Sequence, residues 1–476
     1  MAFRDIRQFI NALKQTGDLV AVKQEVDWDL EAGAINRRAY EMNGPAILFE
    51  NIKDYTEGYR ILAGPLGTFR RLAIAMGLAP DTSIKDLQAE YERRNKPIKP
   101  IIVDSGPCKE NILVGGEVDI YRFPAPMIHE GDGGRYIGTW GIAVFKDPDS
   151  DWMNWGVYRF MVHTRRFLVG WTREHSHLGM TLSEKCIPDN RSLPIAIVIG
   201  AEPLCHVAAA TSYPPGVDEV DFAGGLRQES VALTKCETSD LLVPAYAEIV
   251  IEGEILPDKT AEEGPFGEYS GYRSPSQSMG MLCEIKAITF RNDPILTMIS
   301  AGVPDDHSPV IAVTAATAIK QALIRRGIPV TEVHVPPHSG LHIAIVGVES
   351  GGRDMARKIF EALTRRRALM SKIIVVDKDV NVFNLDQVLH ALGVKCHPVN
   401  GILAEALAPG VGNTATPCFS LEERMARRGA IAVLDCTWPP EWSREIIPVR
   451  SSFDDTYPEE VKRKVLANWH KYGLWP

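Results

Sequence analysis

The strand-rich part of the chain is interrupted at Glu263-Gly-Pro-Phe-Gly-Glu268, which stands between two predicted strands, Ala247–Ile251 and Met281–Phe290. Pro265 lacks a backbone donor and has a fixed φ, and the two glycines permit conformations that other residues resist, so this stretch cannot form a regular helix. It places two carboxylates five positions apart on a stiff turn. Such a pair suits acid–base chemistry, because neighbouring acids perturb each other's ionisation. A solvated surface turn is the alternative interpretation.

Strand patterns extend on both sides of this turn, from about residue 111 to residue 320. Turn signals separate them, among them Asp147-Pro148 and Pro214-Pro215-Gly216. Further strands are predicted at Gly141–Phe145, Trp155–Met161, Phe167–Trp171 and Pro194–Ile199. Many strands with short connections favour a barrel or a sandwich. A helix is predicted at 222–232.

The two flanking regions, 1–110 and 321–476, alternate helical and strand patterns. In the first, residues 1–17 predict an amphipathic helix, 46–49 a strand and 69–94 a helical stretch broken at Pro80. In the last, strands are predicted at 331–335, 342–346 and 373–376, and helices at 352–369, 384–392 and 458–470. This alternation favours a parallel or mixed sheet. The sequence therefore predicts three domains, 1–110, 111–320 and 321–476.

The last predicted helix carries an apolar stripe. Its members are Val461, Val465, Leu466 and Trp469. A terminal stripe of this kind packs either on its own domain or on a partner subunit.

Composition narrows the class of protein. The chain has 476 residues, and 52 Lys and Arg against 61 Asp and Glu give a net charge of −9, which argues against general binding to nucleic acid or anionic membranes. No apolar run is long enough to span a bilayer, and we expect a cytoplasmic protein. The eight cysteines form no CxxC pair, which argues against a cysteine-based zinc site.

Several side chains other than those of the acidic turn could carry chemistry. Arg159 lies within a predicted strand, and its planar fork suits a carboxylate, although a purely structural ion pair is the alternative. His175 and His177 would share one face of a strand and could bind a metal, or they could lie in an exposed loop. Glu219 could bind a hard cation or simply cap the following helix, and Lys372 could bind a phosphate or mark a solvated strand end.

Read together, these segments resemble the UbiD-like decarboxylases, which use prenylated flavin mononucleotide (FMN). The resemblance covers nearly the whole chain, in order and in spacing. Its motifs are Gly44-Pro-Ala-Ile-Leu-Phe-Glu-Asn51, Asn154-Trp-Gly-Val-Tyr-Arg159, Asp218-Glu-Val-Asp-Phe-Ala-Gly224, Lys235-Cys-Glu-Thr-Ser-Asp-Leu-Leu-Val-Pro244, Ala247-Glu-Ile-Val-Ile-Glu-Gly253 and Glu263-Gly-Pro-Phe-Gly-Glu268. The fold implied is mixed α and β: an N-terminal α/β region, a central split β-barrel that binds the flavin, and a C-terminal α/β domain that oligomerises into a homodimer or a larger assembly.

The resemblance also implies roles for particular residues. Arg159, Glu263 and Glu268 match the family's catalytic network, with Glu268 as the proton donor. Asn154, His177 and Glu219 match the ligands of a manganese or magnesium ion that also holds the cofactor phosphate, with His177 preferred to His175 on its spacing from Asn154.

Other positions would contact the cofactor or a second ion. The segment Val157-Tyr158-Arg159, with Trp171, would border the flavin, and Lys372 would reach its phosphate. Backbone carbonyls near Ala208–Thr211 would line a potassium site. Since a regular strand would point Asn154 and Arg159 to opposite faces, we expect either Asn154 in the turn before the strand or an intervening bulge.

The implied reaction is the reversible, non-oxidative decarboxylation of an aromatic, heteroaromatic or α,β-unsaturated acid through a covalent adduct with prenylated FMN. Losing CO2 from an sp² carbon leaves charge that ordinary side chains cannot accept, so a cofactor is expected. A flavin prenyltransferase would supply it. The ubiquinone branch commonly has Asp where this chain has Glu268, which argues against a polyprenyl hydroxybenzoate substrate. A metal-dependent hydrolase built on the same acidic and His residues, a carboxylase running in reverse and a non-catalytic flavin-binding protein are the alternatives.

Overall fold

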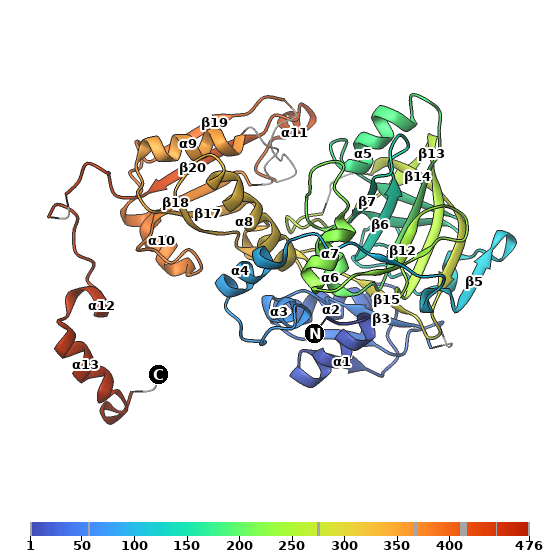
Figure 1. Ribbon diagram of the computed structural model, residues 1–476, viewed down its shortest axis with the longest axis horizontal. Coiled ribbons are helices and arrows are strands. Elements are labelled where there is room, and N and C mark those ends of the chain that lie inside the picture. Colours follow the sequence, from blue (N-terminus) through green and yellow to red (C-terminus); the bar gives the residue numbers. More distant parts are fainter. Residues whose placement is uncertain are drawn as a thin grey trace.

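The computed structural model describes residues 2–55, 58–273, 277–364, 370–409, 417–443 and 445–474. Two bodies lie side by side, with a terminal arm that extends away from both (Figure 1). The N-terminal and central regions form the larger body, and residues from α8 (Ser308–Ile324) to β20 (Ala430–Cys436) form the other.

The N-terminal region is a small four-stranded sheet covered by helices. Its first helix is the predicted amphipathic one, with Ile6, Phe9, Ile10 and Leu13 buried and Asp5 accepting from the backbone N–H of Gln8 at its start. The sheet order is β1-β2-β3-β15. The elements are α1 (Ile6–Thr16), β1 (Leu19–Val22), α2 (Glu31–Glu41), β2 (Ala46–Phe49), β3 (Arg60–Ala63), α3 (Phe69–Ala75) and α4 (Ile84–Arg94). Because β15 (Ile295–Met298) comes from far along the chain, this sheet joins the N-terminal region to the central one.

The central region is built around one large antiparallel sheet. Its strands are β5 (Asn111–Val114), β6 (Gly141–Lys146), β7 (Met153–Gly156), β8 (Arg159–Thr164), β9 (Phe167–Trp171), β10 (Leu193–Ile199), β13 (Ile249–Glu263) and β14 (Ser278–Phe290). A second, three-stranded sheet holds β4 (Ile101–Ile102), β11 (Ala232–Lys235) and β12 (Leu242–Pro244), and the helices are α5 (His177–Thr181), α6 (Pro203–Ala209) and α7 (Glu219–Arg227).

The pairing order of the large sheet explains its curvature. The strands follow one another as β7-β6-β10-β13-β14-β9-β8, with β5 beside β14. The two ends of this path, β7 and β8, are consecutive in sequence and are joined by Val157 and Tyr158. The sheet must therefore curl until its ends approach each other, as a barrel split along one seam does.

Two predictions for this region are wrong. The single strand predicted at Trp155–Met161 is two strands, β7 and β8, because the chain leaves one edge of the sheet at Gly156 and enters the other at Arg159. Asn154 accordingly lies inside β7, and neither a preceding turn nor a bulge is needed. The helix predicted at 222–232 is α7, which begins at Glu219 and ends at Arg227, since residues 232–235 pair as β11.

The C-terminal region has a mixed five-stranded sheet, ordered β16-β17-β18-β20-β19, as the alternation predicted. Its elements are α8, β16 (Val330–His334), β17 (Ile343–Val348), α9 (Arg353–Thr364), β18 (Lys372–Asp377), α10 (Leu385–Val394), β19 (Ile402–Ala406), α11 (Leu421–Met425) and β20. Residues 365–369 of the helix predicted at 352–369 lie outside the described residues. The three-domain division stays a prediction, and α8 would move its second boundary toward residue 305.

The chain ends in an arm that contains α12 (Phe453–Thr456) and α13 (Glu459–Ala467). The arm hangs apart from both bodies (Figure 1), and α13 buries none of its side chains. Packing of the terminal stripe on its own domain, one of the two predicted alternatives, is therefore wrong.

None of the helices in the described ranges is both long and apolar enough to cross a membrane.

Candidate active site

A guanidinium between two carboxylates lies at the seam of the large sheet. Arg159, the first residue of β8, donates from Nε to Glu263 Oε1 at 2.8 Å and from Nη2 to Glu263 Oε2 at 2.9 Å. Its remaining nitrogen, Nη1, donates to Glu268 Oε1 at 2.6 Å. The three residues predicted as the catalytic network are thus in direct contact, although Arg159 and Glu263 lie 104 positions apart.

The two carboxylates have different surroundings. The side chain of Glu263 is fully buried, whereas that of Glu268 keeps 26% of its surface exposed. The interpretation of this turn as a solvated surface feature is therefore wrong for Glu263. Burial by itself would lower the pKa of Arg159, but hydrogen bonds and charge from both carboxylates outweigh burial and raise that pKa. The guanidinium is a permanent cation that both acids share.

Aromatic rings enclose the guanidinium. It lies 5.0 Å from the ring centroid of Phe266 and 5.2 Å from that of Trp171 at the end of β9. Such cation–π contacts stabilise the charge and exclude water from it. Trp171, predicted to border the cofactor, lies in this wall.

The three side chains predicted to bind a metal contact one another, and they come from three separate elements. Asn154 Nδ2, on β7, lies 2.8 Å from His177 Nδ1 and 2.8 Å from Glu219 Oε1, at the starts of α5 and α7. Glu219 Oε2 accepts from the backbone N–H of Trp155 at 2.8 Å. Sequence reasoning predicted all three residues for one site, and the structure brings them together.

The chemistry of these donors fits a divalent cation. Asn154 Oδ1 is buried and has no hydrogen-bond partner among the residues that the structure describes. Burial lowers the pKa of His177, which favours the neutral imidazole that a metal requires. Burial also raises the pKa of Glu219 to about 8, against the hydrogen bond from Trp155, and a cation would relieve that cost by neutralising the carboxylate. In the described ranges no three His, Cys, Asp or Glu side chains lie close enough together to hold a metal ion. This cluster has only two such side chains, His177 and Glu219, and its third possible ligand is the amide of Asn154.

The alternative histidine lies elsewhere. His175 is exposed in the loop before α5, whereas the His177 ring lies 2.8 Å from Asn154 Nδ2 and 3.8 Å from Glu219 Oε1. The structure therefore favours His177.

The remaining predicted contacts are less complete. Val157 and Tyr158 form the link between β7 and β8, and the Tyr158 hydroxyl accepts from the backbone N–H of Leu178 at 3.3 Å. Lys372 is the first residue of β18, and its Nζ donates to Ser371 Oγ at 3.3 Å. Its phosphate contact, and the potassium site near Ala208–Thr211, stay predictions.

Sequence reasoning missed one residue of the network. Tyr136 donates from its hydroxyl to Glu263 Oε1 at 2.8 Å, and both side chains are fully buried. It lies 127 positions from its partner, in a glycine-rich stretch where no local pattern marks it.

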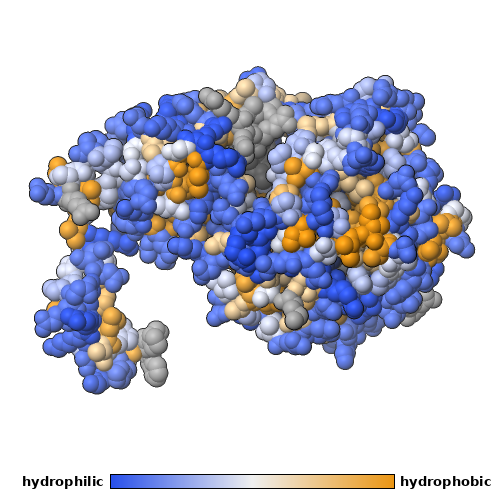
Figure 2. All heavy atoms as spheres, in the orientation of Figure 1, coloured by the Kyte–Doolittle hydropathy of each residue, from blue (hydrophilic) through white to orange (hydrophobic). Residues whose placement is uncertain are grey.

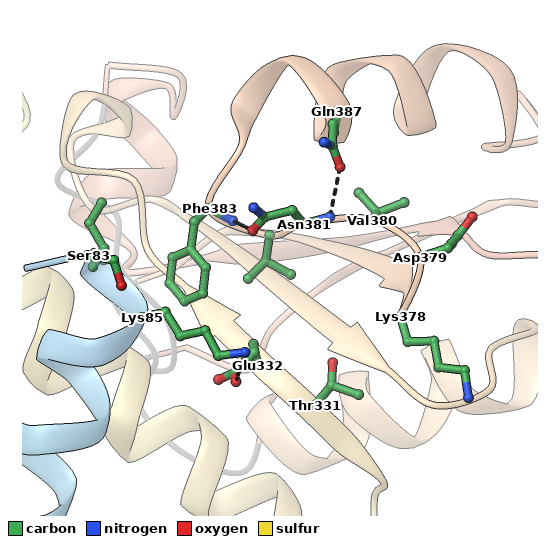
Figure 3. Close-up of a pocket in the computed structure, with 12 residues that line it drawn as sticks. Ser83, Lys85, Thr331, Glu332, Lys378, Asp379, Val380, Asn381, Phe383 and Gln387 are labelled. Atoms are coloured by element: carbon green, nitrogen blue, oxygen red, sulfur yellow. Dashed lines mark hydrogen bonds and ion pairs between the residues drawn. The ribbon is translucent and has the colours of Figure 1, made fainter. Parts of the chain in front are cut away.

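A cleft of about 650 Å³ opens elsewhere, between the start of α4 and the C-terminal sheet (Figure 3). Two polar pairs lie within it: Lys85 Nζ lies 3.4 Å from Glu332 Oε1, and the backbone N–H of Asn381 donates to Gln387 Oε1 at 3.0 Å. It shares no residue with the Arg159 network, so we place the chemistry at that network and not in this cleft.

Comparison with known proteins identifies the family. Residues 10–91, 101–304 and 310–436 match the N-terminal, the Rift-related and the C-terminal domains of 3-octaprenyl-4-hydroxybenzoate carboxy-lyase. The pyrrole-2-carboxylic acid decarboxylase of Pseudomonas aeruginosa is 35% identical over 491 residues, which cover 99% of this chain and 98% of that protein.

Solved structures agree with this match. Vanillic acid decarboxylase from Sedimentibacter hydroxybenzoicus in its closed form superposes with a TM-score of 0.88 at 29% identity, over 99% of this chain and 100% of that one. The UbiD-class enzyme HmfF from Pelotomaculum thermopropionicum, in complex with FMN, gives 0.83 at 28% identity, over 98% and 100%. An evolved dimeric form of HmfF in complex with prenylated FMN gives 0.79 at 28% identity, over 94% and 97%.

A mixed α/β chain that superposes on these structures over nearly its whole length has the architecture of this class of carboxy-lyase. The chain belongs to the UbiD family of decarboxylases. This membership favours the carboxy-lyase over the hydrolase alternative.

Proposed function

We propose that the protein catalyses the reversible decarboxylation of an aromatic, heteroaromatic or α,β-unsaturated carboxylic acid, with Glu268 as proton donor. The observation that carries this proposal is the asymmetry of the two acids around Arg159. Glu263 is fully buried and accepts three hydrogen bonds, whereas Glu268 is partly exposed and accepts one of the Arg159 donors. A carboxyl at the edge of such a network can hold a proton, turn toward a substrate carbon and recover the proton from solvent.

The other two residues prepare that step. Glu263 pairs with the charge of Arg159 and accepts two of its N–H groups together with the Tyr136 hydroxyl. Arg159 orients Glu268 through Nη1 and offers a positive charge where the substrate carboxylate would bind. By microscopic reversibility the same groups would serve carboxylation under high CO2.

We propose prenylated FMN as the cofactor. The HmfF complexes with FMN and with prenylated FMN support a flavin in this class of enzyme. When bound, it would supply the electron sink that the departing CO2 requires. Val157, Tyr158 and Trp171 would border its ring system, the Asn154 cluster would hold its phosphate through manganese or magnesium, and Lys372 would add a positive charge. Potassium near Ala208–Thr211 belongs to the same proposal.

The carboxylate of the cation site gives a direct test that does not depend on turnover. Glu219→Gln keeps the shape of the side chain and removes its charge, so we expect Mn²⁺ affinity to fall on the order of 100-fold. Calorimetric titration of the cofactor-free protein with Mn²⁺ measures this. The control is Glu252→Gln, because Glu252 is equally buried and also accepts backbone N–H groups, at 2.8 Å from Glu237 and from Thr238. Equal Mn²⁺ affinity in the two variants would refute the site.

We also propose a homodimer in which the terminal arm packs on the partner subunit. Apolar side chains gather along the arm (Figure 2). Exposed large hydrophobics on it are Trp442, Ile446, Val449, Phe453, Tyr457, Val461, Leu466, Trp469 and Tyr472. A stripe of this extent marks a protein–protein surface.

Substitution within the arm tests that surface. Leu466, 62% exposed, and Trp469, 38% exposed, are changed together to Asp. We expect the mass measured by light scattering to fall to that of a monomer, because charges at the centre of an apolar interface are not compensated. Glu460→Gln, on the other side of α13, should leave the mass unchanged. A dimer that persists in the double variant would contradict this role of the arm.

One experiment separates the proposed decarboxylase from flavin-independent chemistry. The protein is purified before and after coexpression with a flavin prenyltransferase, and its absorbance and extractable cofactor are measured. We expect a bound flavin chromophore and activity that depends on it. A protein that never binds flavin yet turns over a substrate would overturn the proposal.

A further inference from the structure

The hydroxyl of Tyr136 is the third donor to Glu263, and it comes from a segment distant in sequence from Glu263. Its oxygen lies 2.8 Å from Glu263 Oε1, the oxygen that also accepts from Arg159 Nε at 2.8 Å. Glu263 Oε2 accepts from Arg159 Nη2 at 2.9 Å. The buried carboxylate is therefore surrounded by donors on both oxygens.

Backbone contacts fix Tyr136 on the same scaffold as Arg159. The neighbours of Tyr136 bond to β8, since Ile137 N donates to Phe160 O at 3.1 Å and Val162 N donates to Arg135 O at 2.8 Å. The Tyr136 ring also packs on Phe266, with centroids 4.3 Å apart. A hydroxyl held by β8 and by the catalytic turn can move little relative to Glu263.

The segment before Tyr136 packs against the turn between the two glutamates. Gly133 N donates to Pro265 O at 2.8 Å. A Cβ on Gly133 would lie 2.1 Å from the carbonyl oxygen of Gly264, so this approach requires glycine. At the other end of the turn, a Cβ on Gly267 would lie 2.7 Å from His129 Cε1. Residues 129–136 thus contact the turn along its whole length.

We propose that Tyr136 is a positioning residue that keeps Glu263 ionised, so that the proton used in catalysis is held by Glu268. This inference rests on the proposed function. A hydrogen bond to a carboxylate favours its charged form, and the two Arg159 nitrogens that contact Glu263 can only donate. Tyr136 itself stays protonated, because burial and then the charge of Glu263 raise its pKa.

Several charged or titratable groups surround Glu263. Arg159 approaches from β8, Glu268 from the far side of the turn, and Tyr136, His129 and Asp132 from the segment that packs against the turn. The strand β14 faces Glu263 with Gly280, which brings no charge. Asp132 already accepts from the backbone N–H of His129 at 3.0 Å and contacts its ring at 3.1 Å, so loss of the Tyr136 hydroxyl leaves that pair intact.

The test replaces Tyr136 by Phe, which removes the hydroxyl and keeps the ring. In the cofactor-free protein, the carboxyl carbon of Glu263 is followed by ¹³C NMR after glutamate labelling, with its signal assigned by loss in Glu263→Gln. We expect its titration to move upward by about one pH unit, because a donor to a charged group has been removed. In the flavin-loaded enzyme we expect kcat to fall about tenfold with KM changed less than twofold, and the acidic limb of the kcat profile to move to higher pH.

Tyr40→Phe is the matched control, since Tyr40 is also buried and donates its hydroxyl to the backbone oxygen of Gly67, in the N-terminal region. It should leave the Glu263 titration and the acidic limb unchanged. If Tyr136→Phe does not fold, 4-aminophenylalanine at position 136 keeps the ring and a weaker donor, and the Glu263 signal should still titrate above its wild-type position.

A Glu263 signal that titrates at the same pH with and without the Tyr136 hydroxyl would overturn the inference. The NMR arm needs neither flavin nor substrate. A protein that shifts as expected but releases no CO2 would therefore refute the proposed function and leave the role of Tyr136 toward Glu263 standing.

Discussion

Glu268→Gln is expected to abolish net decarboxylation, by at least about 10³-fold, while flavin stays bound. Arg159 Nη1 lies 2.6 Å from Glu268 Oε1 in the wild-type protein, and the amide of glutamine, which has the size of the acid, can still accept from it. The amide cannot donate a proton to the substrate carbon. Turnover is measured as product formed per bound flavin, with flavin quantified after its release from denatured protein.

The control for this variant is the same chemical change six positions earlier. Glu262 is exposed on the neighbouring stretch of β13, so Glu262→Gln should retain wild-type turnover. Near-normal turnover by Glu268→Gln would refute its role as proton donor, whatever the substrate.

Arg159→Met is expected to have the second largest effect, because it leaves a fully buried carboxylate without its cation. Removing one partner of a buried ion pair costs about 3–5 kcal/mol, so we expect a loss of that size in the free energy of unfolding, together with loss of activity. Urea denaturation of the flavin-free protein measures the free energy of unfolding.

Two further variants test whether the loss of stability in Arg159→Met comes from the buried, unpaired carboxylate. Arg165 makes an ion pair with Asp119 on the surface, where its side chain is 74% exposed, so Arg165→Met should cost at most about 1 kcal/mol. Adding Glu263→Gln to Arg159→Met removes the uncompensated charge and should restore at least half of the lost stability. Equal stability of the Arg159→Met and Arg165→Met variants would contradict the buried network.

The sequence predicts the regular elements of this fold well, because the spacing of apolar residues within each segment indicates whether it forms a helix or a strand. The buried face of α1 and the strands at β6, β9 and β10 follow directly from apolar spacing. The break at Val157 and Tyr158 does not, since both are strand-forming residues and the local pattern is continuous. The seam is set by the return of the chain to the opposite edge of the sheet, which is a property of the whole barrel.

The same contrast holds for the site. Arg159 and the two glutamates could be predicted because the resemblance to the UbiD-like decarboxylases places them in one network. The burial of Glu263 could not, because it depends on partners more than 100 positions away. Tyr136 shows this most clearly, since a tyrosine that follows Gly133-Gly134-Arg135 has no feature that distinguishes a buried donor from a surface residue.

We propose that this chain decarboxylates an unsaturated acid at the Arg159, Glu263 and Glu268 network with the aid of a prenylated flavin. The most direct test of this proposal is the release of CO2 from a panel of aryl, heteroaryl and acrylic acids, by protein coexpressed with a flavin prenyltransferase. We predict CO2 and the protonated product from at least one acid, dependent on the prenylated flavin and absent in Glu268→Gln. Equal CO2 release by flavin-free protein, or by Glu268→Gln through repeated turnovers, would contradict the account.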